Sequence, residues 1–193
     1  MRVQLIHAHP LEASFTRAVA AGAAEALRAR GHDVHETDLY GDAFEPSLTA
    51  AERASYHAPP YDGSAVAGHI EALRRAEGLV FCFPQWWFGM PAILKGYFDR
   101  VWAPGVAFEH KPAGGLTPLL HHVRLFAVVT TYGAPWYVAR LWAGDPVRHQ
   151  AMRGLKPMCP KASGRYLALY DMDRASAAKR AAFLERVGRV LAV

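Results

Sequence analysis

Aromatic side chains are concentrated just after an apolar run, in the sequence FPQWWFGMP from residue 83 to residue 91. A loop that faces water rarely carries this much aromatic surface without packing it against something. An isoalloxazine ring would meet that need, because it requires an apolar platform beside it and hydrogen-bond donors at its polar edge. The alternative is that Trp86, Trp87 and Phe88 pack into the core or a dimer interface.

Hydroxyl groups follow a second apolar run, in the sequence HAHPLEASFT from residue 7 to residue 16. Ser14 and Thr16 are expected at the start of a helix, where unpaired N–H groups and the positive end of the helix dipole bind phosphate without a lysine. His9 would add a donor to the same oxygens. The simpler alternative is that Ser14 only caps the helix.

A third apolar run ends in Thr130, Thr131, Tyr132 and Gly133. Small and hydroxylated residues let backbone N–H groups approach the carbonyl oxygens of a ligand. Alone, this sequence is typical of an ordinary turn, but three such ends at one edge of a sheet would form a binding site.

Alternating strand and helix patterns predict the elements that position these three ends. The expected strands are 2–7, 33–39, 78–83, 123–130 and 165–170, and the expected helices are 14–30, 64–76, 91–102 and 174–191. Such alternation requires a parallel sheet with helices on both faces. We therefore expect one α/β domain over residues 1–193, with five strands in the order 2-1-3-4-5. In such sheets ligands bind at the carboxyl ends of the strands, near the point where the strand order switches.

Composition and motifs exclude several other classes of protein. The net charge of +5 is spread without a dense basic block, so we expect no nucleic-acid partner. No apolar run is long enough to span a bilayer, and the opening residues do not resemble a signal peptide, which predicts a cytoplasmic protein. The two cysteines have no metal-ligand spacing, and neither a metal site nor a disulfide is expected. The first strand end lacks a G-x-G-x-x-G motif and a P-loop lysine, and Ser14 is not in a G-x-S-x-G hydrolase motif.

Two connections, residues 44–63 and 104–122, are unusually long. Loops of this length in a compact domain are usually functional lids or interface segments, unless they are disordered.

The segment FPQWWFGMPAILKGYFDRVW resembles the NAD(P)H:quinone oxidoreductases with a flavodoxin-like fold. HAHP with SFT, ETDLY, VAFEH and TTYG support the resemblance, which extends over about the first 140 residues. It implies a homodimer with a non-covalently bound flavin. The sequence WFGMPAILKG is more similar to that of the FAD-binding members of the family, so FAD is favoured over FMN.

The resemblance also implies which residues contact the flavin. The phosphates would be bound by His9, Ser14, Phe15 and Thr16. The isoalloxazine would lie on Pro84, Gln85, Trp86, Trp87 and Phe88, and its pyrimidine edge on Thr130, Thr131, Tyr132 and Gly133. The usual TTGG of the family is TTYG here, and a tyrosine in place of a glycine is expected to crowd the flavin or to shift the loop.

The implied reaction is ping-pong transfer of hydride from NAD(P)H through the flavin to a quinone or a similar acceptor. Relatives place a tyrosine and a histidine after the fourth strand, where they stabilise negative charge on the reduced flavin, and Tyr137 and His149 are the candidates by type and position. The alternative function is a flavin-binding electron carrier or an accessory subunit of the kind found in potassium efflux systems. Such carriers are usually acidic, whereas this chain is basic.

Overall fold

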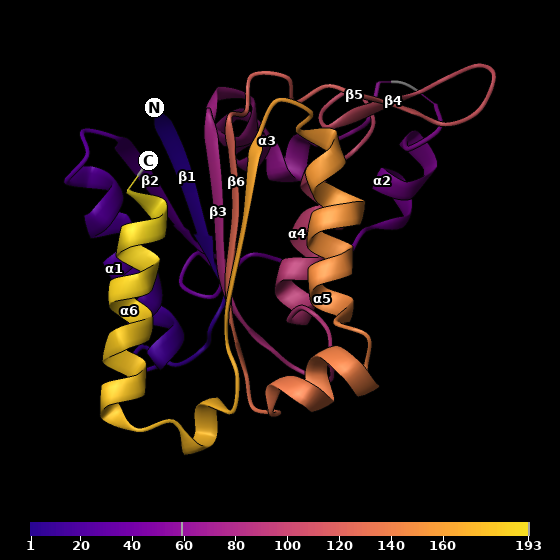
Figure 1. Cartoon of the computed structure of the whole chain (residues 1–193). Helices are drawn as coiled ribbons and strands as arrows, with labels where there is room; N and C mark the ends of the chain where they lie inside the picture. The colour runs from indigo at the N-terminus through magenta and orange to yellow at the C-terminus, as the bar shows by residue number, and fades with distance from the viewer. Residues whose placement is uncertain (59, 193) are drawn as a thin grey trace.

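A five-stranded parallel sheet runs through the middle of the molecule in the order β2-β1-β3-β6-β7 (Figure 1). The structure is a computed structural model and describes residues 1–58 and 60–192. The strands are Arg2–His7 (β1), Asp33–Asp38 (β2), Gly78–Gln85 (β3), Leu125–Tyr132 (β6) and Ser163–Leu169 (β7). Counted along the sheet strands alone, this is the predicted order 2-1-3-4-5, and the flavodoxin-like α/β topology is confirmed.

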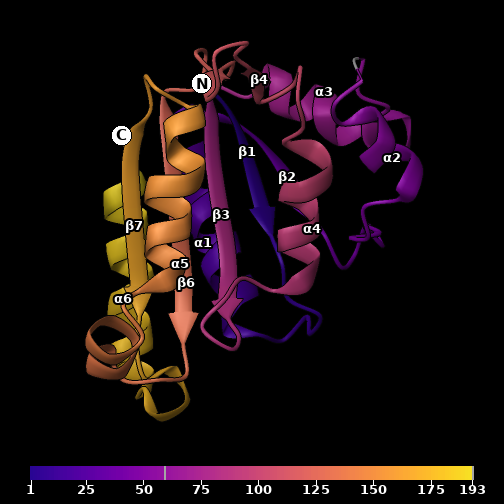
Figure 2. The same cartoon turned by 90° about the vertical axis from the view of Figure 1, so that its right-hand side faces the viewer.

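Helices cover both faces of the sheet, as right-handed crossovers between parallel strands require. Helices α1 (Phe15–Arg28) and α6 (Ala177–Leu191) pack together on one face. Helices α3 (Ala67–Arg75), α4 (Ala92–Val101) and α5 (Pro146–His149) cover the other, as Figures 1 and 2 show. The five strands and four helices predicted from the sequence are therefore present, with ends that differ by a few residues.

Helix boundaries follow local chemistry at some ends and not at others. Ser14 caps α1 by accepting a hydrogen bond from the Arg17 N–H at 3.2 Å, and Gly31 has a φ of +76° just beyond the helix end, as expected. The predicted cap at Ser64 is wrong, because residues Ser64–Val66 form a 3₁₀ turn (η1) that precedes α3. The Ser64 N–H instead binds the Asp62 carboxylate at 3.2 Å.

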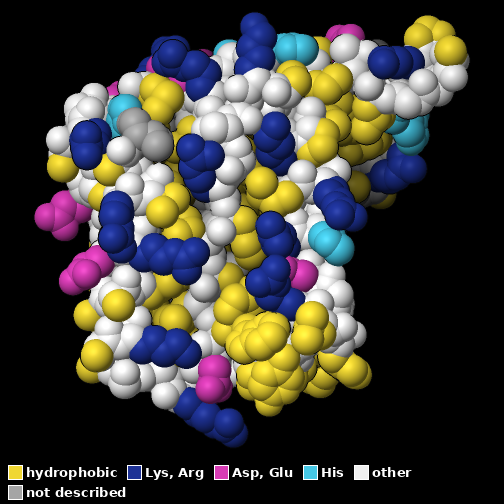
Figure 3. Space-filling view, viewed as in Figure 1, with side chains coloured by type: hydrophobic (Ala, Val, Ile, Leu, Met, Phe, Trp, Pro, Cys, Tyr) yellow, Lys and Arg dark blue, Asp and Glu magenta, His cyan; other side chains and the backbone are white. Residues whose placement is uncertain are grey.

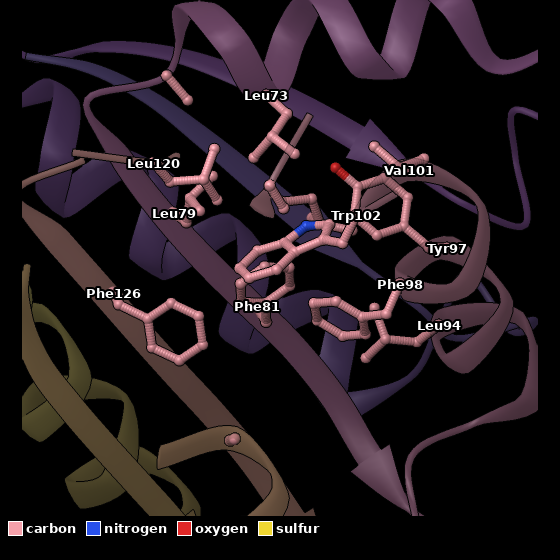
Figure 4. Close-up of a cluster of buried hydrophobic side chains, with 14 of the residues drawn as sticks. Leu73, Leu79, Phe81, Leu94, Tyr97, Phe98, Val101, Trp102, Leu120 and Phe126 are labelled. Atoms are coloured by element: carbon pink, nitrogen blue, oxygen red, sulfur yellow. The ribbon is translucent and has the colours of Figure 1, made fainter. Parts of the chain in front are cut away.

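The larger of two hydrophobic clusters lies between the sheet and helices α3 and α4. Phe81 of β3 contacts Phe98 and Phe126 with ring centroids 5.1 and 5.5 Å apart, and Trp102 closes the group (Figure 4). The two central strands, β3 and β6, supply residues to both faces because they are buried on both sides. This packing holds their carboxyl ends in register.

The two long connections contain structure that the sequence did not predict. The first contains helix α2 (Ala50–Ser55), and the second contains an antiparallel hairpin of β4 (Phe108–His110) and β5 (Leu116–Pro118). Both lie toward the amino ends of the sheet strands (Figure 1). They border a hollow of about 950 Å³ that Tyr56, Arg74 and His110 help to line. This hollow is thus remote from the strand ends at which ligands are expected.

The crossover from β6 to β7 contains a helical stretch that was also missed. It runs through a π-helical turn η2 (Val138–Trp142), helix α5, a second π-helical stretch η3 (Gln150–Leu155) and a 3₁₀ turn η4 (Lys156–Met158). A further 3₁₀ turn, η5 (Met172–Arg174), precedes α6. Within residues 1–58 and 60–192, no helix is long and apolar enough to cross a membrane.

Gly96 of α4 lets the first long connection pack directly on the helix. A Cβ added there would lie 2.2 Å from the Pro46 carbonyl oxygen and 2.5 Å from the Pro46 Cα, which are backbone atoms that cannot swing aside. We expect Gly96→Ala to lower the free energy of unfolding by about 1–3 kcal/mol, although alanine favours helix. Urea denaturation measures this effect.

Gly68→Ala is the matched control, because Gly68 lies in α3 with open space around its Cα. This change should raise the free energy of unfolding by about 0.5–1 kcal/mol, the usual gain for alanine over glycine inside a helix. Equal effects of the two substitutions would show that Gly96 is not kept small by Pro46.

Candidate functional site

The three polar and aromatic strand ends come together at one edge of the sheet. Strand β3 lies between β1 and β6, with His7 opposite Cys82 and Gln85 opposite Tyr132. The carboxyl ends of all three strands therefore meet at the lower edge of the molecule in Figure 1. The strand order switches here, between β1 and β3, as the sequence predicted for a ligand site.

Ring contacts join the three ends. His9, after β1, meets Trp86, after β3, with ring centroids 6.0 Å apart and an interplanar angle of 60°. Phe88, in the same loop as Trp86, meets Trp142 of η2 at 5.8 Å. The loops after β1, β3 and β6 thus form one continuous aromatic surface.

Much of this aromatic surface is open to solvent. Trp87 is 99% exposed and Trp142 is 78% exposed, while Trp86 is only 40% exposed. Leu141, Trp136 and Tyr137 are exposed in the same region, and a large hydrophobic patch lies at the lower edge of the molecule in Figure 3. An apolar patch of this kind marks a binding surface in soluble proteins. Its aromatic and apolar side chains suit a conjugated ring system.

The loop after β3 is a tight turn held in a strained conformation. Trp86 and Gly89 exchange two backbone hydrogen bonds of 3.1 and 2.9 Å around Trp87 and Phe88. Both of these central residues have positive φ, at 51° and 55°. Such a turn normally contains Asn-Gly, because residues with a large side chain are disfavoured at positive φ. Strain of this kind clusters at functional sites, where it is retained for binding.

Replacing Trp87-Phe88 with Asn-Gly should separate stability from binding. We expect the double variant to be more stable in urea by about 1 kcal/mol for each residue relieved of strain. We also expect it to bind a flavin at least about ten-fold more weakly, because two apolar rings are lost. Flavin fluorescence titration measures the affinity.

Ala43→Gly is the control for this prediction. Ala43 also has a positive φ, 51°, but lies in the connection after β2, away from the aromatic loop. It should gain stability and keep its flavin affinity. If the Asn-Gly variant bound flavin as tightly as the native turn, Trp87 and Phe88 would not belong to the site.

The start of α1 presents donors toward the same edge. The Ser14 hydroxyl oxygen accepts from the Arg17 N–H, so its proton is free to donate outward. The N–H groups of Phe15 and Thr16 lie in the first turn, where no intrahelical acceptor exists. A shallow hollow of about 540 Å³, lined in part by Ser14 and Arg17, opens beside them. These groups can bind a phosphate.

His9 is oriented as a further donor. Its Nδ1 accepts a hydrogen bond from the Leu11 N–H at 3.0 Å, so the neutral ring carries its proton on Nε2. Burial lowers the pKa of His9, and the nearby Arg17 guanidinium lowers it further. The ring is therefore neutral near pH 7, with Nε2–H available to an anionic oxygen.

The end of β6 differs from the expectation for Tyr132. Thr130 and Thr131 are buried, and Gly133 is exposed. The Tyr132 side chain is 0% exposed and points into the protein, where its hydroxyl donates to Asp145 Oδ1 at 3.1 Å. The Tyr132 side chain therefore does not lie at the open edge, because alternation along β6 directs it into the protein, and a shift of the loop by this residue stays a prediction.

Tyr137 and His149 lie in different parts of the crossover. Tyr137 is 54% exposed, directly before η2, and its ring contacts Trp136 at 6.1 Å. His149 is the last residue of α5 and is exposed. Tyr137 thus belongs to the aromatic surface, whereas His149 lies beyond η2, at the end of α5. Sequence reasoning did not assign Trp136, Leu141 or Trp142 to the site, although all three are exposed apolar side chains that follow β6.

A buried donor at the end of β3 supports a ligand with its own polar edge. Gln85 Nε2 is buried and has no hydrogen-bond partner among the described residues. Unsatisfied buried donors are costly, so a bound group with carbonyl oxygens at this edge would relieve that cost. Together with the phosphate-binding helix start and the aromatic surface, these residues fit a flavin. In the described part of the chain, no group of three or more His, Cys, Asp or Glu side chains is arranged to hold a metal ion.

Comparison with known proteins identifies the fold and the relatives that the sequence predicts. The family model described as flavodoxin-like fold matches residues 1–191. NAD(P)H dehydrogenase [quinone] 1 of Rattus norvegicus is 28% identical over 160 residues, which cover 75% of this chain and 58% of the rat protein. The chain therefore spans less than two thirds of that relative. Ribosyldihydronicotinamide dehydrogenase [quinone] of Homo sapiens is 28% identical over 186 residues, covering 84% of this chain and 80% of the human protein.

A solved structure agrees over the whole chain. NAD(P)H:quinone oxidoreductase from Methanothermobacter marburgensis has a TM-score of 0.86 and 27% identity, covering 100% of this chain and 96% of that one. The resemblance predicted from the segment FPQWWFGMPAILKGYFDRVW is thereby confirmed. From its fold, its strand-end chemistry and these matches, this chain belongs to the flavodoxin-like fold family.

Proposed function

We propose that the chain binds a flavin at the carboxyl edge of its sheet and transfers hydride from NAD(P)H, through that flavin, to a quinone or a similar acceptor. The observation that supports this most directly is the continuous aromatic surface formed by the ring pairs His9–Trp86 and Phe88–Trp142. It lies beside a helix start with free donors, which is the combination that a flat ring carrying a phosphate requires. The names of the relatives supply the electron donor and the acceptor.

The residues of the chain have separate tasks in this proposal. His9, Ser14, Phe15 and Thr16 bind the phosphate, and Pro84, Gln85, Trp86, Trp87 and Phe88 support the ring system. Thr130, Thr131, Tyr132 and Gly133 border its pyrimidine edge at the end of β6. When bound, the flavin supplies the hydride chemistry, and the protein supplies position and electrostatics.

Tyr137 is the proposed donor to the negative charge that develops on the reduced ring. It is half-exposed next to the aromatic surface, and a phenol hydroxyl can donate one hydrogen bond to an anionic oxygen or nitrogen. His149 is a weaker candidate for the same role because it lies at the end of α5.

The identity of the flavin is open to a direct test. The sequence of the segment after β3 is more similar to that of the FAD-binding members of the family, which favours FAD. Two structures with the same fold are described in complex with FMN, an azoreductase of Bacillus anthracis, 14% identical, and a general stress protein of Treponema denticola, 20% identical. The start of α1 offers donors for the phosphate that FMN and FAD share, so the phosphate contacts alone do not distinguish the two flavins. Mass spectrometry of the flavin released from purified protein distinguishes them.

A homodimer is part of the proposal. The hydrophobic patch at the carboxyl edge is wide, and Trp87 and Trp142 extend well beyond the ring contacts of one chain. A second copy would cover this remaining apolar surface. Light scattering after gel filtration gives the mass, which should be about twice 21.2 kDa.

The alternative is a flavin-binding electron carrier or accessory subunit that turns over little quinone. Steady-state kinetics with NADH, NADPH and menadione separate the two functions. Parallel lines in double-reciprocal plots, with turnover on the scale of enzymes, support the proposed ping-pong reaction. A protein that binds flavin but turns over menadione no faster than free flavin would be a carrier.

A further inference from the structure

A buried chain of hydroxyl groups connects the sheet to the crossover after β6. Tyr132 lies on β6, Asp145 lies before α5, and Tyr166 lies on β7. Tyr132 Oη donates to Asp145 Oδ1 at 3.1 Å, and the hydroxyls of Tyr132 and Tyr166 are also hydrogen-bonded. Because the Tyr132 proton is used toward Asp145, Tyr166 must donate to Tyr132. The bonds therefore run in one direction, from Tyr166 to Tyr132 to Asp145.

This cluster is well protected from solvent. Tyr132 is 0% exposed and Asp145 is 5% exposed. Burial, the neighbouring hydroxyl of Tyr166 and the Asp145 carboxylate all raise the pKa of Tyr132 far above its usual range, so its proton stays on the oxygen. Hydrogen bonds to a carboxylate in such surroundings are stronger than those between neutral groups.

Asp145 follows the segment that carries the exposed aromatic side chains and holds the carboxyl-terminal end of that segment. We use the name aromatic segment for residues 136–142, which include Trp136, Tyr137 and Trp142. The Asp145 N–H donates to the Ala139 carbonyl at 2.8 Å, and the His149 N–H donates to the Asp145 carbonyl at 3.0 Å. Asp145 Oδ2 also lies 3.7 Å from Arg140 Nε. Asp145 thus contacts the aromatic segment and α5 through its backbone, and Tyr132 of the sheet through its carboxylate.

Within the aromatic segment, Ala139 is buried and the other residues are exposed or half-buried. The segment contains the π-helical turn η2. This geometry is rare in proteins as a whole, and where it occurs it is often at a functional site. Asp145 itself has a φ of 53°, in the left-handed region. Just before the aromatic segment begins, the Ala134 carbonyl accepts a hydrogen bond from the Asp171 N–H at 3.0 Å. The position of Trp142 against Phe88 therefore depends on Asp145.

We propose that Tyr132 is a positioning residue that, through Asp145, fixes the aromatic segment at the carboxyl edge and so sets the space available to ligands over the flavin ring. The inference rests on the proposed function for its effect on ligands, but its structural part does not require a flavin. The Tyr132 hydroxyl acts through Asp145 and does not touch the reacting atoms. Losing it should loosen the segment and weaken the binding of both NAD(P)H and the acceptor, since both occupy the same space.

The test compares Tyr132→Phe, Asp145→Asn and Tyr166→Phe by hydrogen–deuterium exchange. Tyr166→Phe is the matched control, because it removes one buried hydroxyl from the same cluster and keeps the bond from Tyr132 to Asp145. We expect exchange of the Asp145 and His149 amides to accelerate at least about ten-fold in the first two variants and less than three-fold in the control. Exchange in β3 and α1 should not change in any of them.

Steady-state kinetics provide a readout that a general loss of stability would not give. Tyr132→Phe should raise the KM for NAD(P)H and for menadione about ten-fold and change kcat much less. The double variant Tyr132→Phe with Asp145→Asn should be no worse than the more affected single variant, because Tyr132→Phe removes the bond that Asp145→Asn weakens by taking away the carboxylate charge.

The outcomes separate this inference from the proposed function. Unchanged exchange of the Asp145 and His149 amides in Tyr132→Phe would overturn the inference, even in a protein that reduces menadione. Additive effects in the double variant would overturn it as well. Faster exchange in a protein that binds no flavin would support the positioning by Tyr132 and would contradict the proposed function instead.

Discussion

Ser14→Asp should almost abolish flavin binding and leave the protein at least as stable as before. Aspartate caps a helix as well as serine does, and a carboxylate at a helix N-terminus is favoured by the helix dipole. The same carboxylate would face the phosphate of the flavin. Two unit charges about 4 Å apart repel by about 4 kcal/mol at the dielectric response typical near a protein surface, which is roughly a thousand-fold in affinity. Fluorescence titration with FMN and FAD measures the loss.

Ser176→Asp is a close control for this prediction. Ser176 caps α6 with the same geometry, accepting from the Lys179 N–H at 3.2 Å, just as Ser14 accepts from the Arg17 N–H at 3.2 Å. It should keep the native flavin affinity and a similar unfolding midpoint. If Ser14→Asp bound flavin within about three-fold of the native protein, the start of α1 would not be the phosphate site.

Arg100→Ala should produce the largest loss of stability among single changes outside the site. The Arg100 and Glu52 side chains are only 5% and 4% exposed, and Arg100 Nη2 lies 2.7 Å from Glu52 Oε1. Arg100 also donates to the Glu45 carbonyl, so it fastens the first long connection to α4. Removing one partner of a buried ion pair leaves the other charge uncompensated, which costs about 3–5 kcal/mol. Urea denaturation at pH 7 measures the free energy of unfolding.

Acid titration gives this prediction a second readout. Burial raises the pKa of Glu52, but hydrogen bonds from Arg100 and Thr49 outweigh that effect and the pKa is lowered overall. A carboxyl group with a lowered pKa in the folded state stabilises the protein above its ordinary pKa of about 4.3. That contribution is lost as the pH falls through the lowered value. In Arg100→Ala, this part of the acid-induced loss of stability should disappear.

Arg75→Ala is the control for the ion pair. Arg75 and Glu71 form an exposed pair on α3, with side chains 65% and 56% exposed, and its loss should cost no more than a few tenths of a kcal/mol. A loss below about 1 kcal/mol in Arg100→Ala would contradict the account of how the first long connection is held.

The strand ends and the fold could be predicted because their signals are local. Buried strands such as β3 appear as continuous apolar runs, and the aromatic loop follows directly in the sequence. Ser14 is identifiable as a cap from its own neighbours. The resemblance of one segment of about twenty residues then supplied the relatives, which the comparisons confirm.

Contacts between distant residues could not be predicted in the same way. Tyr132 and Tyr166 are 34 residues apart, and only the parallel pairing of β6 with β7 brings them together. Helix α2 was missed because it has only six residues, and its main support, Arg100, lies 48 residues away from Glu52. The crossover helix was missed because π-helical turns disrupt the usual helical periodicity of its apolar residues.

The most direct test of the central claim is the visible spectrum of the purified protein, reconstituted with flavin and followed anaerobically. The account predicts that the flavin band near about 450 nm bleaches on addition of NAD(P)H and returns on addition of menadione, because the same site serves donor and acceptor. Bound flavin that stays oxidised after NAD(P)H would contradict the oxidoreductase and favour a carrier. Failure to bind FMN or FAD would contradict the flavin site itself.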